Sequence, residues 1–305
     1  MAQQARRAAS WLKPALNAIA GTAAVALLRL LRLTNPDRIA NFAGRVMRRV
    51  GPWLPEHRIG LANLTAAFPE KAPNEIETIL SGVWDNLGRV AAEYAHLDRL
   101  WDYDWEDPNS RIEEATGTAT RFRALRDDGK PALVFAAHLG NWELPAVGAT
   151  VYGTDSAILY RAPNIGDVAE AINRIRAVNM GMLIPAGPDA VLRVAAALDR
   201  GAHVGMLVDQ HFERGVDVRF FGRTCKANPM MARLAQHYDC PIHGVRTIRL
   251  ANHRFRFELT PALAAVRDTG GNVDIQATMQ MITSVVEDWV REYPEQWLWL
   301  HRRWR

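Results

Sequence analysis

Residues 138–143, His-Leu-Gly-Asn-Trp-Glu, hold the combination most suited to chemistry, a histidine followed after four residues by an acid. The imidazole of His138 can take up a proton near neutral pH, and the carboxylate of Glu143 can fix its tautomer and favour the imidazolium that forms. The spacing alone is weak evidence, because nine histidines and 33 acidic residues among 305 positions predict about one such pair by chance. A second pair, His253 and Glu258, lies on a predicted strand, where residues five apart face opposite sides and cannot cooperate.

The surroundings of His138 distinguish it from a chance pair. It follows the apolar run 133–137 and precedes a turn through Gly140 and Asn141, after which a helix is predicted. A strand-to-helix turn can fold back, so that the imidazole meets Glu143 in the first helical turn. The alternative is a histidine with satisfied hydrogen bonds at a strand end, with Glu143 as a favourable charge at the start of a helix. The pattern leaves both interpretations open.

No nucleophile of the chain accompanies this pair. None of the five serines lies in a Gly-x-Ser-x-Gly turn, and neither Cys225 nor Cys240 adjoins a histidine. If His138 is a base, it would therefore activate a hydroxyl of a bound acceptor, with direct transfer and no covalent enzyme intermediate. The chain also lacks a glycine-rich nucleotide loop, so kinase and dehydrogenase functions have no support. Two cysteines build neither a disulfide framework nor a metal site, and a reducing compartment fits them best.

The elements that must position His138 alternate along the second half of the chain, which predicts an α/β core with a substantially parallel sheet. Buried strands are expected at 131–137, 157–160, 182–185, 204–208 and 241–245, and helices at 144–151, 168–178, 189–198, 230–237 and 273–293. The strictly alternating segment 254–259 is predicted to be an edge strand. Ligands gather at the carboxyl edge of such sheets, which directs attention to His138, Tyr160-Arg161 and Asp209-Gln210, each placed after a strand.

Residues 34–130 are expected to be mainly helical, with a long amphipathic helix over 75–97 capped by Asn74. We predict a single domain over 37–305, in which a helical lead-in (37–129) precedes the α/β core (130–305). Its composition, 49% hydrophobic and 23% charged, is that of a globular protein.

Charge is distributed unevenly along the chain. The first 50 residues hold nine basic side chains and one acid, Asp37, whereas the other 255 residues hold 28 basic and 32 acidic side chains. Residues 14–28 are uncharged, and basic residues flank them. This pattern favours a membrane anchor or interfacial helix over 1–36 with its basic flanks on the cytoplasmic side. An amphipathic helix packed on the body is the alternative. The acidic balance of the body argues against nucleic-acid binding.

These motifs, in this order, resemble the bacterial lipid A biosynthesis acyltransferases, the late lauroyl and myristoyl transferases. The likeness runs from the apolar N-terminal segment to the end of the chain, and the related acyltransferases of phosphatidylinositol mannosides share the fold and the His/acid pair. Besides residues 138–143, it rests on Tyr160-Arg161, Pro163-Asn164, Arg174-Ile175-Arg176, Asp209-Gln210, Phe220-Phe221-Gly222 and the run 294–304, Pro-Glu-Gln-Trp-Leu-Trp-Leu-His-Arg-Arg-Trp.

The resemblance implies a glycerolipid acyltransferase-like sheet and an enzyme on the cytoplasmic face of the inner membrane. Such an enzyme moves a fatty acyl group from acyl carrier protein to a hydroxyl of a lipid A precursor, an anionic glycolipid, without a metal or another cofactor. An apolar slot beside His138 is expected to hold the acyl chain, because an exposed tail costs about 0.8 kcal/mol for each CH₂.

By the same resemblance, His138 is the general base and Glu143 its partner. The functional arginine falls at Arg174 or Arg176, of which we prefer Arg174, and the functional aspartate matches Asp209.

Arg161 is expected to bind anionic groups of the substrate or to stabilise the oxyanion. Asn141, within the motif 138–143, is included among the predicted substrate contacts.

Two other functions compete with this one. The first is an acyltransferase of the same family that acts on a phosphatidylinositol mannoside with acyl-coenzyme A. The second is a catalytically silent membrane-binding scaffold, which explains the basic arm but gives no reason for His138, Glu143 and Asp209 to follow strands.

Overall fold

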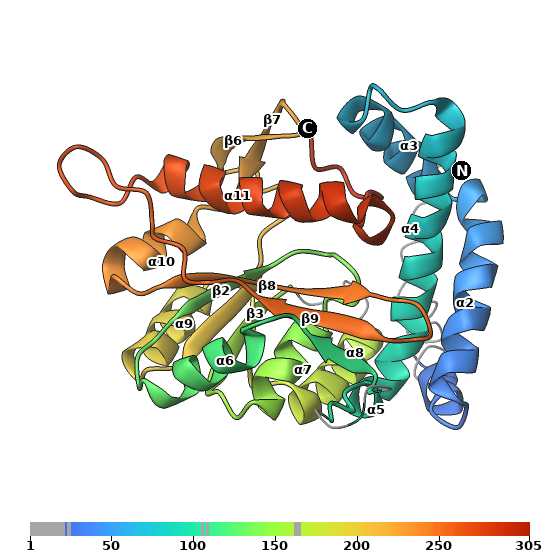
Figure 1. Ribbon diagram of the computed structural model, residues 1–305, viewed down its shortest axis with the longest axis horizontal. Helices are drawn as coiled ribbons and strands as arrows, with labels where there is room; N and C mark the ends of the chain where they lie inside the picture. Colours follow the sequence, from blue (N-terminus) through green and yellow to red (C-terminus); the bar gives the residue numbers. More distant parts are fainter. Residues whose placement is uncertain (1–21, 23–25, 105–106, 108–109, 162–165) are drawn as a thin grey trace, which may run out of the picture.

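A computed structural model describes residue 22 and residues 26–104, 107, 110–161 and 166–305 (Figure 1). Its centre is a seven-stranded sheet with the order β1-β9-β8-β2-β5-β3-β4. The strands are β1 (Ile112–Glu114), β2 (Leu133–Ala136), β3 (Ser156–Tyr160), β4 (Met182–Pro185), β5 (His203–Leu207), β8 (Ile242–Arg249) and β9 (Phe255–Leu259). The predicted α/β fold with a mostly parallel sheet is confirmed.

The register of the central strands determines what meets at their carboxyl edge. Strand β2 lies between β5 and β8 and runs parallel to both. Ala136 at the end of β2 is level with Leu207 at the end of β5. The chain therefore leaves the same edge of the sheet at both places, and His138 and Asp209 each follow two residues later.

Strand β9 departs from the sequence prediction, because it is not at the edge of the sheet. It pairs antiparallel with β8 on one side and parallel with the short strand β1 on the other. The alternation of apolar and polar residues in β9 therefore does not come from a position at the sheet edge. Phe255 and Phe257 are buried in the core, while Arg256 points away and pairs with Glu113 of β1 at 2.8 Å. A second, two-stranded sheet of β6 (Val216–Phe220) and β7 (Arg223–Ala227) was not predicted.

Helices cover both faces of the sheet and form two cores. One core joins β2, β3 and β5 with the helices of one face and with the terminal tryptophans, and the other holds the aromatic residues around β9. The first face carries α9 (Ala190–Asp199), α10 (Met230–Tyr238) and α11 (Ile275–Glu292), and the second carries α6 (Thr118–Asp127), α7 (Leu144–Val151) and α8 (Gly166–Asn179). The predicted helix and strand positions in this half of the chain agree with these elements to within a few residues.

A helical layer precedes the sheet and packs at its end (Figure 1). It consists of α2 (Pro36–Val50), η1 (Gly51–Trp53), α3 (Pro55–Ala67), α4 (Pro73–Glu93), η2 (Tyr94–His96) and α5 (Leu97–Leu100). Helix α4 begins at Pro73, a residue suited to the first turn, and not after Asn74 as predicted. The carboxylate of Glu75 accepts the backbone N–H of Ala72 and so caps this end.

The predicted membrane segment 1–36 lies largely outside the described residues. Within its described part, residues 26–31 are helical, and Arg32 pairs with Asp98 of the helical layer at 2.7 Å. None of the helices in the described ranges is both long and apolar enough to span a bilayer. The division at residue 36 therefore stays a prediction.

Candidate active site

The turn after β2 presents His138 at the edge of the sheet. Gly140 has a φ of +58°, and a Cβ at this position would lie 1.9 Å from the carbonyl oxygen of Thr247, so only glycine fits. The C-terminal segment holds the turn in place, since Leu298 N–H donates to the His138 carbonyl at 3.0 Å and Gly140 N–H donates to that of Gln296 at 3.0 Å.

The carboxylate of Asp209, from the segment after β5, fixes the imidazole. His138 Nδ1 lies 2.8 Å from Asp209 Oδ1, and the backbone N–H of His138 donates to Oδ2 at 2.8 Å. Trp297 Nε1 donates to the same Oδ2 at 2.7 Å. A carboxylate accepts and does not donate, so Nδ1 carries the proton and Nε2 presents its lone pair on the other side of the ring.

Burial and charge act in opposite directions on this pair. Burial lowers the pKa of His138, but the charge of Asp209 and its hydrogen bond raise it, and the pKa ends above its usual value of 6.5. Burial raises the pKa of Asp209, but the charge of His138 and the hydrogen bonds it receives bring it well below its usual range. Asp209 is therefore an anion that stabilises a protonated imidazole.

The outer nitrogen of the imidazole has weak contacts. The amide nitrogen of Gln210, an exposed side chain, lies 3.4 Å from His138 Nε2. The ring of Trp142 lies beside the imidazole, with centroids 5.3 Å apart. A hydroxyl group that displaces Gln210 would meet the free lone pair of Nε2.

Glu143 does not bind the imidazole as expected. Its carboxylate accepts hydrogen bonds from Arg176 Nε at 2.8 Å and Nη2 at 2.5 Å, and also one from the hydroxyl of Tyr94. The role expected of Glu143 toward Nδ1 belongs to Asp209, because the parallel pairing of β2 and β5 brings Asp209 to His138, whereas α8 brings an arginine to Glu143. Glu143 still helps to raise the pKa of His138 through its charge.

Arg176, and not the preferred Arg174, lies at this site. Its guanidinium is close to the rings of Tyr94 and Tyr160, with the central carbon 5.8 Å and 5.4 Å from their centroids. Its Nη1 is buried and finds no hydrogen-bond partner in the described part of the chain. Arg174, two residues earlier on α8, pairs with Glu170 at 3.4 Å and its side chain is 65% exposed.

The remaining residues predicted to contact the substrate differ in their exposure to solvent. Asn141 is fully buried, where its amide donates to Glu93 at 2.8 Å and its oxygen accepts the backbone N–H of Glu143. Asp209 is buried as well, so neither side chain is positioned to touch a substrate directly. Arg161 is exposed just after β3.

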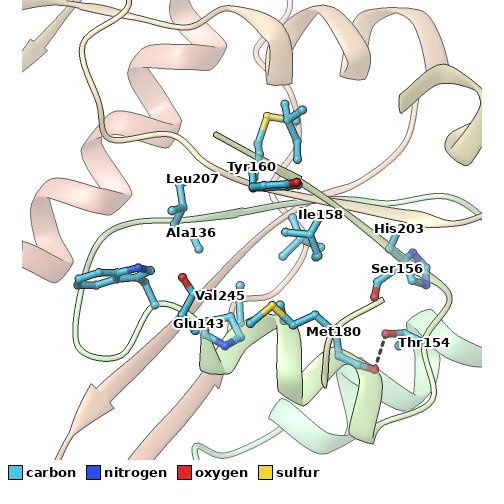
Figure 2. Close-up of a pocket in the computed structure, with 18 of the residues that line it drawn as sticks. Ala136, Glu143, Thr154, Ser156, Ile158, Tyr160, Met180, His203, Leu207 and Val245 are labelled. Atoms are coloured by element: carbon cyan, nitrogen blue, oxygen red, sulfur yellow. Dashed lines mark hydrogen bonds between the residues drawn. The ribbon is translucent and has the colours of Figure 1, made fainter. Parts of the chain in front are cut away.

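An apolar cavity of about 90 Å³ lies between the sheet and helices α6, α7 and α8. Trp142, Glu143 and Arg176 line it at the carboxyl edge of the strands, and Figure 2 shows Ser156, His203 and Thr154 gathered away from Glu143, toward the other end. Between these ends the wall is formed by residues such as Val134, Ile158 and the side-chain-free Gly205. The cavity therefore reaches the turn 138–143 through Trp142 and Glu143, but His138 is not among the residues that line it, and the slot beside His138 stays a prediction.

Two residues of the site, Tyr94 and Trp297, were not predicted to contact it from the sequence. Tyr94, which binds Glu143, carried no signal, because it lies in the helical layer far from the motif. Trp297 belonged to a recognised terminal motif, but its hydrogen bond to Asp209 was not expected. No group of three His, Cys, Asp or Glu side chains within the described ranges is arranged to hold a metal ion.

Comparison with known proteins adds one finding to this geometry. The sequence pattern of the family described as bacterial lipid A biosynthesis acyltransferase matches residues 6–305, nearly the full chain. A search of curated proteins finds none that matches. The match includes the histidine turn, the segment after β5 and the terminal tryptophans that together form the site. The chain therefore belongs to the bacterial lipid A biosynthesis acyltransferase family.

Proposed function

We propose that this acyltransferase moves a fatty acyl chain from the thioester of acyl carrier protein to a hydroxyl of a lipid A precursor, on the cytoplasmic face of the inner membrane. The observation that carries the proposal is the placement of His138. Asp209 holds its Nδ1, while Nε2 has only a 3.4 Å contact with Gln210, and Trp142, whose ring lies beside the imidazole, lines an apolar cavity. Family membership supports the reaction type.

His138 is the proposed general base. As the acceptor oxygen attacks the thioester carbonyl, Nε2 takes the hydroxyl proton, and the imidazolium that forms is stabilised by the anion of Asp209. When the tetrahedral intermediate collapses, the carbon–sulfur bond breaks and the imidazolium returns the proton to the leaving thiolate. The new carbon–oxygen bond is the ester of the product, and His138 is neutral again.

Arg176 is the proposed stabiliser of the oxyanion. Arg176 lines the same cavity as Trp142, and its Nη1 has no hydrogen-bond partner among the described residues, so this nitrogen can donate to a carbonyl at the cavity mouth. Glu143 binds Nε and Nη2 of this arginine and fixes the direction of Nη1. In this mechanism Glu143 is a positioning residue for Arg176, and its charge favours the imidazolium.

The cavity is the proposed site of the acyl chain. It follows β3 from Tyr160 to Ser156, four residues or roughly 13 Å of strand. With carbon–carbon bonds of about 1.5 Å in a zigzag, this length accepts roughly ten methylene groups. The free volume of about 90 Å³ is smaller than such a chain, so flexible lining side chains such as Met180 would have to move for a medium-length chain, with its carbonyl beside Arg176, to occupy the cavity.

Exposed arginines suit the acceptor. Arg161 follows Tyr160 at the cavity mouth, and Arg174 lies on the helix that carries Arg176. Both can approach the phosphates of an anionic glycolipid. The basic residues of the first 50 positions would hold the enzyme at an anionic membrane surface.

The test is direct transfer by the purified protein. Dodecanoyl-acyl carrier protein and a lipid A precursor should give a product that is one acyl chain heavier by mass spectrometry, and lipid A from cells without the gene should lack that chain. Parallel reactions with dodecanoyl-coenzyme A and with a phosphatidylinositol mannoside identify the true donor and acceptor. Absence of transfer from either donor to either acceptor would reject the proposal. The membrane-binding scaffold would then be the remaining candidate function.

A further inference from the structure

The buried end of the acyl cavity carries two polar groups that its apolar walls do not explain. Ser156 and His203 begin β3 and β5, are paired in the register of the sheet, and both line the cavity. They are 5% and 6% exposed, respectively. Ser156 Oγ and His203 Nδ1 are buried without a hydrogen-bond partner in the described ranges. A buried polar group without a partner is unfavourable, so a pair of them on one wall indicates a ligand group.

The hydrogen-bonding roles of the two groups are complementary. His203 Nε2 lies 3.0 Å from the carbonyl oxygen of Leu125, to which it must donate, so Nδ1 of the neutral ring is an acceptor. Burial lowers the pKa of His203 and keeps the ring neutral. Ser156 Oγ can donate its proton. The end of the cavity therefore offers one donor and one acceptor side by side (Figure 2).

A hydroxyl group matches this pair. It donates one hydrogen bond to His203 Nδ1 and accepts one from Ser156 Oγ. A methyl group at this position would leave both atoms unpaired. A water molecule can make the same two hydrogen bonds, and Thr154 Oγ1, which donates to the Ala149 carbonyl at 2.7 Å, keeps lone pairs for its second proton, so water is the alternative that the test must distinguish.

We propose that Ser156 and His203 form a binding site for a hydroxyl group near the distal end of the acyl chain. This inference rests on the proposed acyl role of the cavity and deepens it, since it identifies a class of donor, medium-length chains hydroxylated near their last carbon. The distance along β3 places this hydroxyl roughly ten to twelve carbons from the carbonyl.

The test compares binding of dodecanoate and 12-hydroxydodecanoate, and of decanoate and 10-hydroxydecanoate, by calorimetry with the full-length protein. In the wild type, one hydroxylated chain should bind about tenfold tighter than its plain counterpart, which is the effect of one to two net hydrogen bonds. Ser156→Ala, a small change at a cavity wall, should reduce that preference, because only the hydrogen bond to His203 Nδ1 remains, and leave binding of the plain chain equal or tighter.

Thr154→Val is the matched control, because it removes another hydroxyl at the same end whose hydrogen bond is already used within the chain. Its preference for the hydroxylated chain should equal that of the wild type. Plain chains that bind as tightly as hydroxylated ones, or a preference that Ser156→Ala leaves undiminished, would overturn the inference and indicate bound water at this place. Loss of binding of all four chains would instead reject the acyl role of the cavity itself.

Discussion

Two buried ionic clusters flank the turn 138–143, and they differ in what they leave unpaired. The first, which we call the site cluster, comprises His138, Asp209, Glu143 and Arg176. The second, the Glu93 cluster, comprises Glu93, Arg249, Asn86 and Asn141, with Arg249 Nη1 2.5 Å from Glu93.

In the Glu93 cluster, every nitrogen of Arg249 has a partner, and the amide of Asn86 donates to the carbonyl oxygens of Gly140 and Gln296. In the site cluster, by contrast, Arg176 Nη1 has no partner among the described residues and His138 Nε2 has only a 3.4 Å contact. The acids and arginines of the two clusters are similarly buried. We infer that unused hydrogen-bonding capacity beside a cavity is the feature that separates the proposed catalytic arrangement from a structural one.

Replacing the base should give the largest loss of activity. His138→Ala removes Nε2, and kcat/KM for acyl transfer should fall by about 10²- to 10⁴-fold, the usual contribution of a general base. Turnover should be compared for equal amounts of folded protein, because the change also takes one hydrogen-bond partner from the buried carboxylate of Asp209. Near-normal turnover in this variant would contradict the assignment of His138.

The same kind of change in the Glu93 cluster should affect stability. Arg249→Met leaves Glu93 buried without its partner and should lower the free energy of unfolding by about 3–5 kcal/mol. The double variant with Glu93→Gln should recover part of this loss. Turnover by the folded fraction should stay within a few-fold of the wild type. A stable Arg249→Met protein with lost turnover would abolish the distinction between the clusters.

The two arginines of α8 offer a matched pair. Arg176→Met should lower kcat by about 10²- to 10³-fold, the usual effect of removing one oxyanion donor. Arg174→Met, on the exposed side of the same helix, should change kcat by less than threefold, although KM for an anionic acceptor rises if its charge contributes to binding. Equal effects on kcat would remove the case for Arg176.

The pH dependence should be the smallest effect. Only the unprotonated imidazole can act as a base, and the pKa of His138 lies above 6.5 because Asp209 outweighs the effect of burial. As pH falls below that pKa, kcat/KM should therefore decrease tenfold for each pH unit, and it should level off above it. Gln210→Ala, which removes an uncharged neighbour, should leave the profile unmoved. A profile that stays flat down to pH 6 would show that the group acting as base is not His138.

Most of the second half of the fold was predictable, because its strands are buried parallel strands with continuous apolar runs and its helices have clear periodicity. The prediction failed where pairing partners decide the outcome. Strand β9 became internal through the three-residue strand β1, which is too short to carry a pattern. In the hairpin β6–β7, two charged residues interrupt each strand, Asp217 and Arg219 in β6 and Arg223 and Lys226 in β7, so neither strand has a continuous apolar run.

The candidate site was predictable as a set of residues but not as a set of contacts. His138 and Asp209 were both expected at the carboxyl edge, yet the local spacing favoured Glu143 as the partner of the imidazole. The actual pair is separated by 71 positions and follows from the adjacency of β2 and β5, which no short-range pattern encodes. The choice between Arg174 and Arg176 depended likewise on which side of α8 faces the sheet.

Gly205, in the middle of β5, lines the apolar cavity at a position where a larger side chain would reduce the cavity volume. A Cβ there would lie 3.0 Å from the tip of Ile158, a flexible neighbour that can yield. The side chain of alanine or valine at this position would then occupy part of the apolar cavity, while the backbone and the histidine turn stay as they are. In the proposed function, a single substitution at Gly205 would therefore shorten the acyl chain that the cavity accepts without a change in the chemistry at His138.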